Sequence, residues 1–319
     1  MVFPSSVIPT ISLGTSTFGW TTNESQSKTI LNSFLELGGF FIDTADSYSQ
    51  WQLGNIGGEA ETYIGNWLKS AQSLRKELLI SSKVGKSRLS PGLSPKNIVT
   101  SCDQSLLRLK TDYIDIYYMH TYDQSVPLEE SLSAFERLFT QGKIRGLGLS
   151  NFTRDQLLEL MSLKTSEYKI EILAFSNHYN LLERDGKDLG YDEYSEATNC
   201  KMETEILPLL KEYNIPSVPY HSLARGFLTG KYFEHPELTS VHSERVRKYN
   251  DTRGRKVIER LKTISDSVQK PMASVALEWL RSQHSPTIPA ISVRNIAQLK
   301  ECMDRVQLTP EEILFLTLD

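Results

Sequence analysis

Cysteine is scarce in this sequence, which has three cysteines among 319 residues. Cys102, Cys200 and Cys302 lie far apart and are odd in number, so they form neither a metal-binding spacing nor a disulfide framework. That scarcity favours a reducing, cytoplasmic setting. No apolar run approaches the roughly 20 residues that a membrane-spanning helix needs. The first residues contain no basic stretch followed by an apolar one, so we expect no secretory signal.

The sequence also lacks an excess of either charge. Lys and Arg total 35 and Asp and Glu total 39, which gives a net charge of −4. This balance gives no reason to expect a nucleic-acid partner or binding to an anionic membrane. Histidine is scarce too, and residues 15–20 lack the His-x-His pattern that a metal-dependent barrel hydrolase would need near its first strand. We therefore expect no metal site.

Short apolar runs rich in β-branched residues recur along the chain, with amphipathic stretches between them. Several runs are almost continuously apolar, as strands covered on both faces should be. The expected strands are 11–19, 38–46, 78–85, 113–120, 144–150, 170–176, 217–223 and 287–293. Strand then helix, repeated without a shift in composition, predicts parallel strands joined by helices. The count predicts one (β/α)8 TIM barrel domain over residues 1–319.

Two connections are longer than a barrel helix needs. Residues 183–202 are polar and are expected to form an excursion before the next helix. Residues 224–254 are basic, and loops after the seventh and eighth strands of such barrels often bind phosphate. We therefore expect this second loop to face an anion. Its basic residues are Arg225, Lys231, His242, Arg245, Arg247, Lys248 and Arg253.

Four ionisable residues lie at or after the ends of the second, third and fourth expected strands: Asp43, Tyr48, Lys83 and His120. Because function in such barrels sits where strands end, they should share one rim. Tyrosine is a poor acid with a pKa of about 10, but a nearby ammonium lowers that pKa. Lys83 can supply the ammonium, Asp43 can hold it, and His120 can donate a hydrogen bond to a substrate oxygen. This set suits reduction of a carbonyl, in which a cofactor must carry the hydride.

Four longer segments resemble the aldo/keto reductase family, in the family's order and over almost the whole chain. They are GGFFIDTADSY (38–48), GKIRGLGLSNF (142–152), YNLLER (179–184) and YHSLARGFLTGKY (220–232). The resemblance implies that the four ionisable residues are the catalytic tetrad, with Tyr48 as the proton donor. It also implies a nicotinamide cofactor that is bound without a Rossmann fold. The sequence agrees, because it has no G-x-G-x-x-G that opens a βαβ unit.

The same resemblance implies a cofactor site. Ser150 and Asn151 are expected to hold the nicotinamide carboxamide, and Tyr220 to stack on the ring. Residues 222–231 are expected to fold over the pyrophosphate. Arg294 is the expected partner of a 2′-phosphate, since a guanidinium binds phosphate through two hydrogen bonds, so the expected cofactor is NADP(H), with NAD(H) as the alternative. The full set of expected contacts is Ser150, Asn151, Ser176, Tyr220, Ser222, Leu223, Gly226, Lys231, Ser292, Arg294 and Gln298.

Several positions depart from the family's usual pattern. Ser176 stands where the family usually has a glutamine that bonds the carboxamide. His221 and Ser222 stand where Ser-Pro is commoner, and Cys302 replaces the asparagine that usually meets adenine. None belongs to the tetrad, so these departures bear on cofactor affinity and preference. The loop 49–58 is longer than the shortest family versions and should reshape the substrate mouth. The expected pocket residues there are Trp20, Trp51 and Tyr122.

An alternative function stays within the same fold. The resemblance includes subunits associated with potassium channels, so the chain could be a cofactor-binding regulatory subunit with little or no turnover. For an enzyme, the expected partner is a small-molecule carbonyl compound. Aromatic aldehydes, small ketones and sugar-derived carbonyls all stay open, because loops decide substrate choice. The oligomeric state stays open as well.

Overall fold

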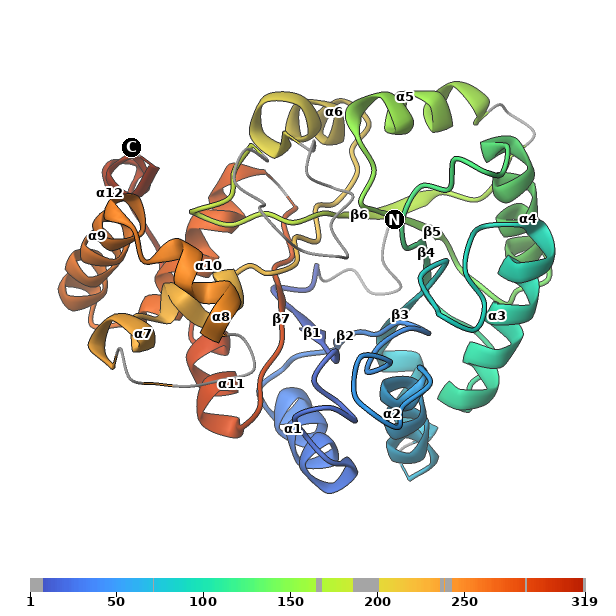
Figure 1. Ribbon diagram of the computed structural model, residues 1–319, viewed down its shortest axis with the longest axis horizontal. Helices are drawn as coiled ribbons and strands as arrows, with labels where there is room; N and C mark the ends of the chain where they lie inside the picture. Colours follow the sequence, from blue (N-terminus) through green and yellow to red (C-terminus); the bar gives the residue numbers. More distant parts are fainter. Residues whose placement is uncertain are drawn as a thin grey trace.

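The structure, a computed structural model, describes residues 8–70, 72–164, 168–185, 201–235, 238, 243–284 and 286–317. Its centre is a parallel sheet of seven strands in the order β6-β5-β4-β3-β2-β1-β7. The strands are β1 (Ser12–Gly14), β2 (Phe41–Asp43), β3 (Leu79–Val84), β4 (Ile116–Met119), β5 (Leu147–Ser150), β6 (Ile172–Ser176) and β7 (Ala290–Ile291). The sheet curls upon itself, and helices surround it (Figure 1).

The barrel closes through the segment expected as its seventh strand, 217–223. Val218 donates its backbone N–H to the carbonyl of Phe175 in β6 (2.7 Å), and Ile288, just before β7, donates to the carbonyl of Ser217 (2.8 Å). The segment pairs through isolated bridges rather than a continuous ladder. The prolines at positions 216 and 219 have no N–H to donate, which interrupts the ladder. The predicted (β/α)8 barrel is confirmed, and the eighth pairing segment, 217–223, takes part through isolated bridges.

The helices begin at the side chains that the sequence offers for capping. Asn23 accepts the N–H of Gln26 (2.9 Å) ahead of α1, and Ser94 accepts that of Asn97 (3.3 Å) ahead of α3. These helices cover the outside of the sheet (Figure 1). The helices are α1 (Glu24–Glu36), α2 (Glu59–Lys69), α3 (Pro95–Leu109), α4 (Leu128–Thr140), α5 (Arg154–Leu163), α6 (Leu207–Glu212), α7 (Lys231–Glu234), α8 (Ser243–Val246), α9 (Thr252–Val268), α10 (Met272–Gln283), α11 (Ile296–Met303) and α12 (Pro310–Thr317).

The two faces of the strands pack against different neighbours. One face joins the large core beneath the helices, to which Leu13, Ile42, Ile80 and Leu149 belong. The other face forms a smaller cluster drawn from many strands, and this cluster fills the barrel: Phe41, Leu79, Ile116, Tyr118, Leu173, Ala174, Val218 and Ile288. Because side chains alternate along a strand, this inner cluster fixes which later residues point inward.

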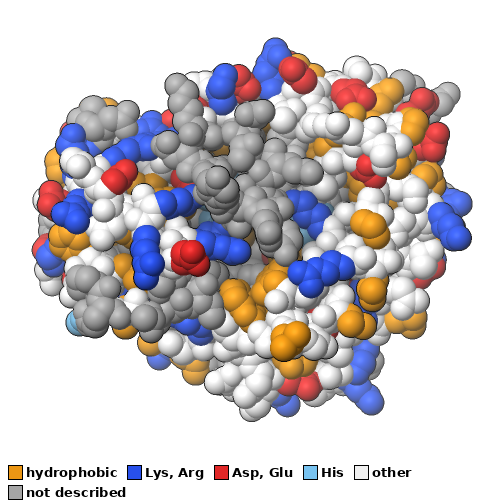
Figure 2. Space-filling view, viewed as in Figure 1, with side chains coloured by type: hydrophobic (Ala, Val, Ile, Leu, Met, Phe, Trp, Pro, Cys, Tyr) orange, Lys and Arg blue, Asp and Glu red, His pale blue; other side chains and the backbone are white. Residues whose placement is uncertain are grey.

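The long loops are described in part. Residues 186–200 of the expected excursion, with Cys200, and residues 236–237 and 239–242 of the basic loop, with His242, lie outside the described residues. The remaining basic loop forms the short turns η4 (Ala224–Thr229) and η5 (Arg247–Tyr249) with α7 and α8. Figure 2 shows Lys and Arg side chains gathered on the face that carries α7, α8 and α9. Among the described helices, none is long and apolar enough to cross a membrane.

Candidate active site

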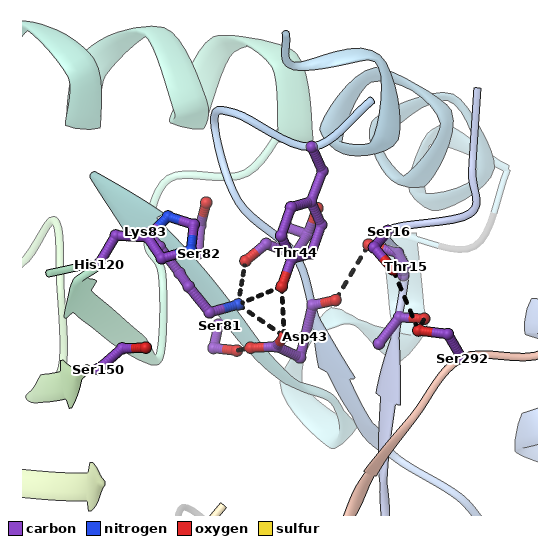
Figure 3. Close-up of polar contacts among 12 residues, drawn as sticks. Thr15, Ser16, Asp43, Thr44, Ser81, Ser82, Lys83, His120, Ser150 and Ser292 are labelled. Carbon is purple, nitrogen blue, oxygen red and sulfur yellow. Dashed lines mark hydrogen bonds and ion pairs between the residues drawn. The ribbon is translucent and has the colours of Figure 1, made fainter. Parts of the chain in front are cut away.

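Alternation along the strands brings most of the predicted tetrad into the barrel. Asp43 lies two residues after the inner-core residue Phe41, and His120 lies two residues after Tyr118. Both therefore point inward, nearer to the carboxyl ends of the strands than the core beneath them. Lys83 of β3 is in register with Tyr118 of β4, on the same face. Figure 3 shows Asp43, Lys83, His120 and Ser150 facing one region from neighbouring strands.

Lys83 is the centre of the hydrogen bonds within the tetrad. Its Nζ donates to Asp43 Oδ2 (2.6 Å) and to the Thr44 carbonyl (2.8 Å), as Figure 3 shows. A third bond runs from Nζ to Tyr48 Oη (3.0 Å). The other oxygen of Asp43 accepts from Ser81 Oγ (2.6 Å). Lys83 and Asp43 are 3% and 6% exposed, so this is a buried ion pair whose three ammonium donors all have acceptors.

The acidity of Tyr48 differs from the sequence-based expectation. We expected Lys83 to lower the pKa of Tyr48, but burial, followed by the negative charge of Asp43, holds that pKa well above its usual value. Burial disfavours the charged phenolate, and an ammonium 3.0 Å away does not outweigh it. The phenol therefore stays protonated across the ordinary pH range, which is the state that a proton donor needs.

His120 faces the same region from the end of β4. The centroid of its ring lies 6.2 Å from that of Tyr48. Its Nδ1 atom is buried and has no hydrogen-bond partner within the part of the chain that the structure describes. Burial, followed by the charges of Lys86 and Lys83, lowers the pKa of His120 well below its usual value. The imidazole is therefore neutral near pH 7, and it can still donate one N–H.

The aromatic residues expected at the substrate mouth divide into two groups. The ring of Trp51 lies 6.2 Å from Tyr48 and 5.7 Å from Trp20, the latter edge-on. Tyr122 instead donates from its hydroxyl to Glu159 in α5 (3.0 Å). The structure thus brings Trp20 and Trp51 together beside the tetrad and places the hydroxyl of Tyr122 against α5.

The loop 49–58 is fastened to its surroundings at several points. Asn55 Nδ2 donates to the carbonyls of Gly19 (2.8 Å) and Ser49 (3.1 Å). The side chain of Gln50 accepts the backbone N–H of Arg88 (2.9 Å), which lies in the loop after β3. These bonds join the loop, which follows β2, to the loops that follow the neighbouring strands β1 and β3.

Asn151 and Tyr220, both expected at the nicotinamide, are joined directly. Tyr220 Oη donates to Asn151 Oδ1 (2.6 Å). Asn151 Nδ2 donates to the carbonyl of His120 (2.8 Å) and to Ser150 Oγ (3.1 Å). The φ of Asn151 is +59°, in the left-handed region that asparagine tolerates better than most residues. The bond to His120 connects the expected cofactor side with the tetrad.

Asn177, which no sequence motif singled out, holds this turn. Asn177 accepts the N–H of Asn151 on Oδ1 (2.7 Å) and donates from Nδ2 to the carbonyl of Phe152 (3.0 Å). Its neighbour Ser176, expected near the carboxamide, is buried, and its carbonyl also accepts the N–H of Asn151 (3.2 Å). The available signal was a polar amide directly after a predicted buried strand.

The segment expected over the pyrophosphate has an uncommon backbone. Ala224, Arg225 and Gly226 have φ values of +47°, +57° and +89°. Each non-glycine residue in this region costs about 1–3 kcal/mol, so its surroundings must hold it there. Two bonds within the chain help to hold it: the N–H of Ala224 donates to the carbonyl of His221 (2.7 Å) and that of Gly226 to the carbonyl of Leu223 (2.8 Å). A Cβ added at Gly226 would lie 2.8 Å from Lys231 Nζ, so the lysine closes over the glycine.

The charge of Arg294 acts on Lys231, and both residues are expected at phosphate groups. Burial, followed by the charge of Arg294, lowers the pKa of Lys231. Arg294 lies ahead of α11, and its backbone N–H donates to Gln298 Oε1 (2.9 Å). Ser292 Oγ donates to a β1 carbonyl (2.9 Å), and Ser222 Oγ donates to the chain before Tyr220 (2.8 Å). The hydroxyl groups of Ser292 and Ser222 thus bond to the backbone of the fold. Lys231 and Arg294 instead place positive charge at the expected phosphate site.

The described residues contain no group of three or more His, Cys, Asp or Glu side chains placed to hold a metal. Cys102 and Cys302 are buried free cysteines, and burial raises the pKa of each thiol to about 12. Cys302 is 4% exposed in α11. Both thiols therefore behave as packing groups.

The sequence is similar to known proteins over most of its length. The model of the Aldo/keto reductase family matches residues 10–315. The chain is 29% identical over 313 residues to the Bacillus subtilis protein named uncharacterized oxidoreductase YrpG, covering 95% of this chain and 89% of the relative. It is 29% identical over 311 residues to the L-glyceraldehyde 3-phosphate reductase of Escherichia coli (92% and 83% covered). A probable voltage-gated potassium channel subunit beta of Arabidopsis thaliana is 27% identical over 314 residues (95% and 89% covered).

Proposed function

The chain belongs to the aldo/keto reductase family of oxidoreductases, and we propose that it reduces an aldehyde or ketone to an alcohol with NADP(H) as cofactor. The observation that carries the proposal is the position of Lys83. Its ammonium donates to Asp43 at 2.6 Å and to Tyr48 at 3.0 Å. A protonated phenol is thereby held beside a fixed positive charge at the mouth of the barrel. NAD(H) is the alternative cofactor.

Tyr48 is the proton donor in this proposal. When bound, a reduced nicotinamide supplies hydride to the carbonyl carbon. As negative charge grows on the carbonyl oxygen, Tyr48 Oη gives that oxygen its proton, and the phenolate left behind is stabilised by the Lys83 ammonium 3.0 Å away. His120, kept neutral by burial, donates a hydrogen bond to the same oxygen.

Three features of the chain support a phosphorylated nicotinamide cofactor. Asn151 and Tyr220 form a bonded pair beside the tetrad, where a carboxamide and a ring would be held. The left-handed turn 224–226, where Gly226 lies against Lys231 Nζ, leaves room beside that cation for a pyrophosphate. Lys231 and Arg294 are like charges close enough to change a pKa, which suits a further phosphate group. These residues fit the cofactor, and the last pair favours NADP(H).

The proposal treats residues 1–319 as one barrel domain that acts in the cytoplasm on a small carbonyl compound. The Escherichia coli relative is named for a phosphorylated aldehyde, L-glyceraldehyde 3-phosphate. A substrate panel should therefore contain phosphorylated and free sugar aldehydes as well as aromatic aldehydes and small ketones.

The test mixes purified protein with NADPH or NADH and each member of that panel, and follows the loss of reduced-nicotinamide absorbance. We expect turnover with at least one aldehyde and tighter binding of NADPH. The second candidate function, a regulatory subunit, draws on the similarity to the Arabidopsis potassium channel subunit. Tight NADPH binding without turnover across the panel would favour that candidate. Failure to bind either cofactor would overturn both.

A further inference from the structure

A buried acidic residue behind the expected nicotinamide site gathers four hydrogen-bonding neighbours. Glu183 is 5% exposed. Its carboxylate accepts from Lys248 Nζ (2.7 Å), Tyr249 Oη (2.6 Å) and Asn180 Nδ2 (3.1 Å). His178 Nε2 contacts the same carboxylate. His178 and Asn180 follow β6, whereas Lys248 and Tyr249 belong to η5. Glu183 therefore joins two loops that are distant in the sequence.

One end of this cluster reaches the ring that we expect to stack on the nicotinamide. The imidazole of His178 lies 5.5 Å from the ring of Tyr220, with 36° between the planes, and 4.8 Å from the ring of His221. Asn180 supports the backbone of the same turn, because its Nδ2 donates to the carbonyl of His221 (3.1 Å). The φ of His221 is +52°, a left-handed conformation that persists only with such support.

The other end reaches the turn expected at the pyrophosphate. The ring of Tyr249 packs 5.5 Å from the ring of Phe227, which follows Gly226 in η4. Gly254 packs against the same pair, since a Cβ there would lie 1.7 Å from the carbonyl oxygen of Tyr249 and 3.3 Å from the ring of Phe227. One carboxylate is thus linked to both the Tyr220 ring and the η4 turn.

The charge of Glu183 sets the character of this link. Burial alone would raise the pKa of Glu183, but the hydrogen bond and charge of His178, with hydrogen bonds from Lys248 and Tyr249, hold that pKa well below its usual range. The group is therefore an ionised carboxylate. Well-packed apolar residues can often replace a buried ion pair without loss of stability, so stability alone gives little reason for this arrangement. What it supplies is a defined geometry among three segments.

We propose that Glu183 is a positioning residue for the cofactor. It holds the Tyr220 ring and the η4 turn in one arrangement, so that both can contact the same bound nicotinamide dinucleotide. This inference rests on the proposed function, because it concerns the same cofactor site. Loss of the carboxylate charge should weaken the contacts of both the Tyr220 ring and the η4 turn with the cofactor. The hydrogen bond between Lys83 and Tyr48 should stay as it is, so cofactor binding weakens while the proton-transfer step is kept.

The test compares Glu183→Gln with Glu203→Gln in the full chain. Glu203 is the control, a carboxylate whose side chain is 21% exposed: it accepts from Arg184 through two bonds of 2.7 Å and from Tyr179 Oη (2.7 Å). Both partners pack on Trp279: Arg184 Cζ lies 5.9 Å from the centroid of its ring, and the centroid of the Tyr179 ring lies 5.7 Å from it. Stopped-flow fluorescence gives the NADPH dissociation rate. Steady-state kinetics give KM for NADPH and for the best carbonyl, and thermal unfolding gives Tm.

Glu183→Gln is expected to release NADPH about 5- to 150-fold faster than the wild type, the usual range of coupling between sites. Its KM for NADPH should rise, and its KM for the carbonyl should stay the same. Glu203→Gln should lower Tm by a similar amount yet release NADPH at the wild-type rate. Equal release rates in the wild type and Glu183→Gln, or equal acceleration in both variants, would overturn the inference.

Tyr249→Phe serves if Glu183→Gln does not fold. It removes one hydrogen bond to the carboxylate and keeps the ring contact with Phe227, so release should accelerate by a smaller factor. Release at the wild-type rate in this variant would also overturn the inference. A wild-type protein that binds neither NADPH nor NADH would overturn the proposed function and this inference with it. Wild-type binding with unchanged release in the variants would overturn this inference alone.

Discussion

Two lysines serve the two halves of the expected active site, and their surroundings differ. Lys83 donates to Asp43 (2.6 Å) inside the barrel, where an opposite charge meets it directly. Lys231 lies near Arg294, and burial followed by that like charge lowers its pKa. The catalytic side balances its charge within the chain, whereas the cofactor side concentrates positive charge. The first is therefore complete before anything binds, and the second is suited to receive an anion.

The two halves also differ in what holds them. Lys83 is in register with Tyr118 across the β3–β4 ladder, so backbone pairing positions the catalytic side. On the cofactor side, Ala224 and Arg225 lie in the left-handed region within a short turn. Turns open more readily than central strands. Changes on the catalytic side should therefore alter chemistry, and changes on the cofactor side should alter affinity.

The largest expected effect is that of Tyr48→Phe, which removes one hydroxyl and keeps the ring. Turnover of the best carbonyl should fall by about 10²–10⁴-fold, the usual contribution of general acid catalysis. The Kd for NADPH, measured by fluorescence titration, should stay the same. Because burial holds the pKa of Tyr48 above its usual value, its ionisation should not limit wild-type reduction below about pH 10. Wild-type turnover in Tyr48→Phe would show that another group donates the proton.

Substitution of the two lysines should change stability by unequal amounts. Lys83→Met leaves Asp43 buried without its cation, which should lower the free energy of unfolding by about 3–5 kcal/mol. Lys231→Met removes a contact with the face of Tyr232 (4.9 Å), worth about 0.5–1 kcal/mol at exposed sites. It also relieves repulsion with Arg294 and removes a smaller attraction to Glu301, so the net change should be close to zero. Urea unfolding of the cofactor-free variants measures both values, and similar losses would contradict the comparison.

The catalytic side could be predicted because its arrangement follows from local periodicity. Alternation along parallel strands places Asp43, Lys83 and His120 on one interior face, and the sequence pattern reports that alternation. The predicted barrel is confirmed by the parallel sheet and by the match to the family over residues 10–315. Residues 217–223 were expected to form a strand, but they pair through isolated bridges, because Pro219 has no N–H to donate to a ladder.

Contacts between distant side chains could not be predicted. Glu183 receives hydrogen bonds from Lys248 and Tyr249, which lie 65 and 66 residues away. Asn177 holds the turn of Asn151 across 26 residues. No local pattern distinguishes such residues from ordinary polar positions. The pKa of Tyr48 escaped prediction for a related reason, since its direction depends on burial, which only the folded chain determines. The roles of the cofactor residues stay predictions.

The smallest expected effect concerns the choice of cofactor and falls on the cofactor side alone. A charge-assisted hydrogen bond contributes about 1.5–3 kcal/mol, and 1.4 kcal/mol is a tenfold change in affinity, so Arg294 should give roughly a 10- to 100-fold preference for NADPH over NADH. Arg294→Ala should remove most of that preference by raising the Kd for NADPH, while the Kd for NADH changes little.

Arg88→Ala is the matched control for this variant. Arg88 is an exposed arginine at the substrate mouth, where its guanidinium donates to the carbonyl of Gln50 (2.9 Å). Its loss should leave the ratio of the two Kd values unchanged, because it lies on the catalytic side. In the wild type, raising the salt concentration should narrow the preference for NADPH over NADH, since salt screens the partly exposed cations. Equal wild-type Kd values for NADPH and NADH would show that Arg294 does not select between the cofactors. The same ratio of Kd values in Arg294→Ala and the wild type would show the same. In either case, the positive charge beside Lys231 would not be explained by a 2′-phosphate.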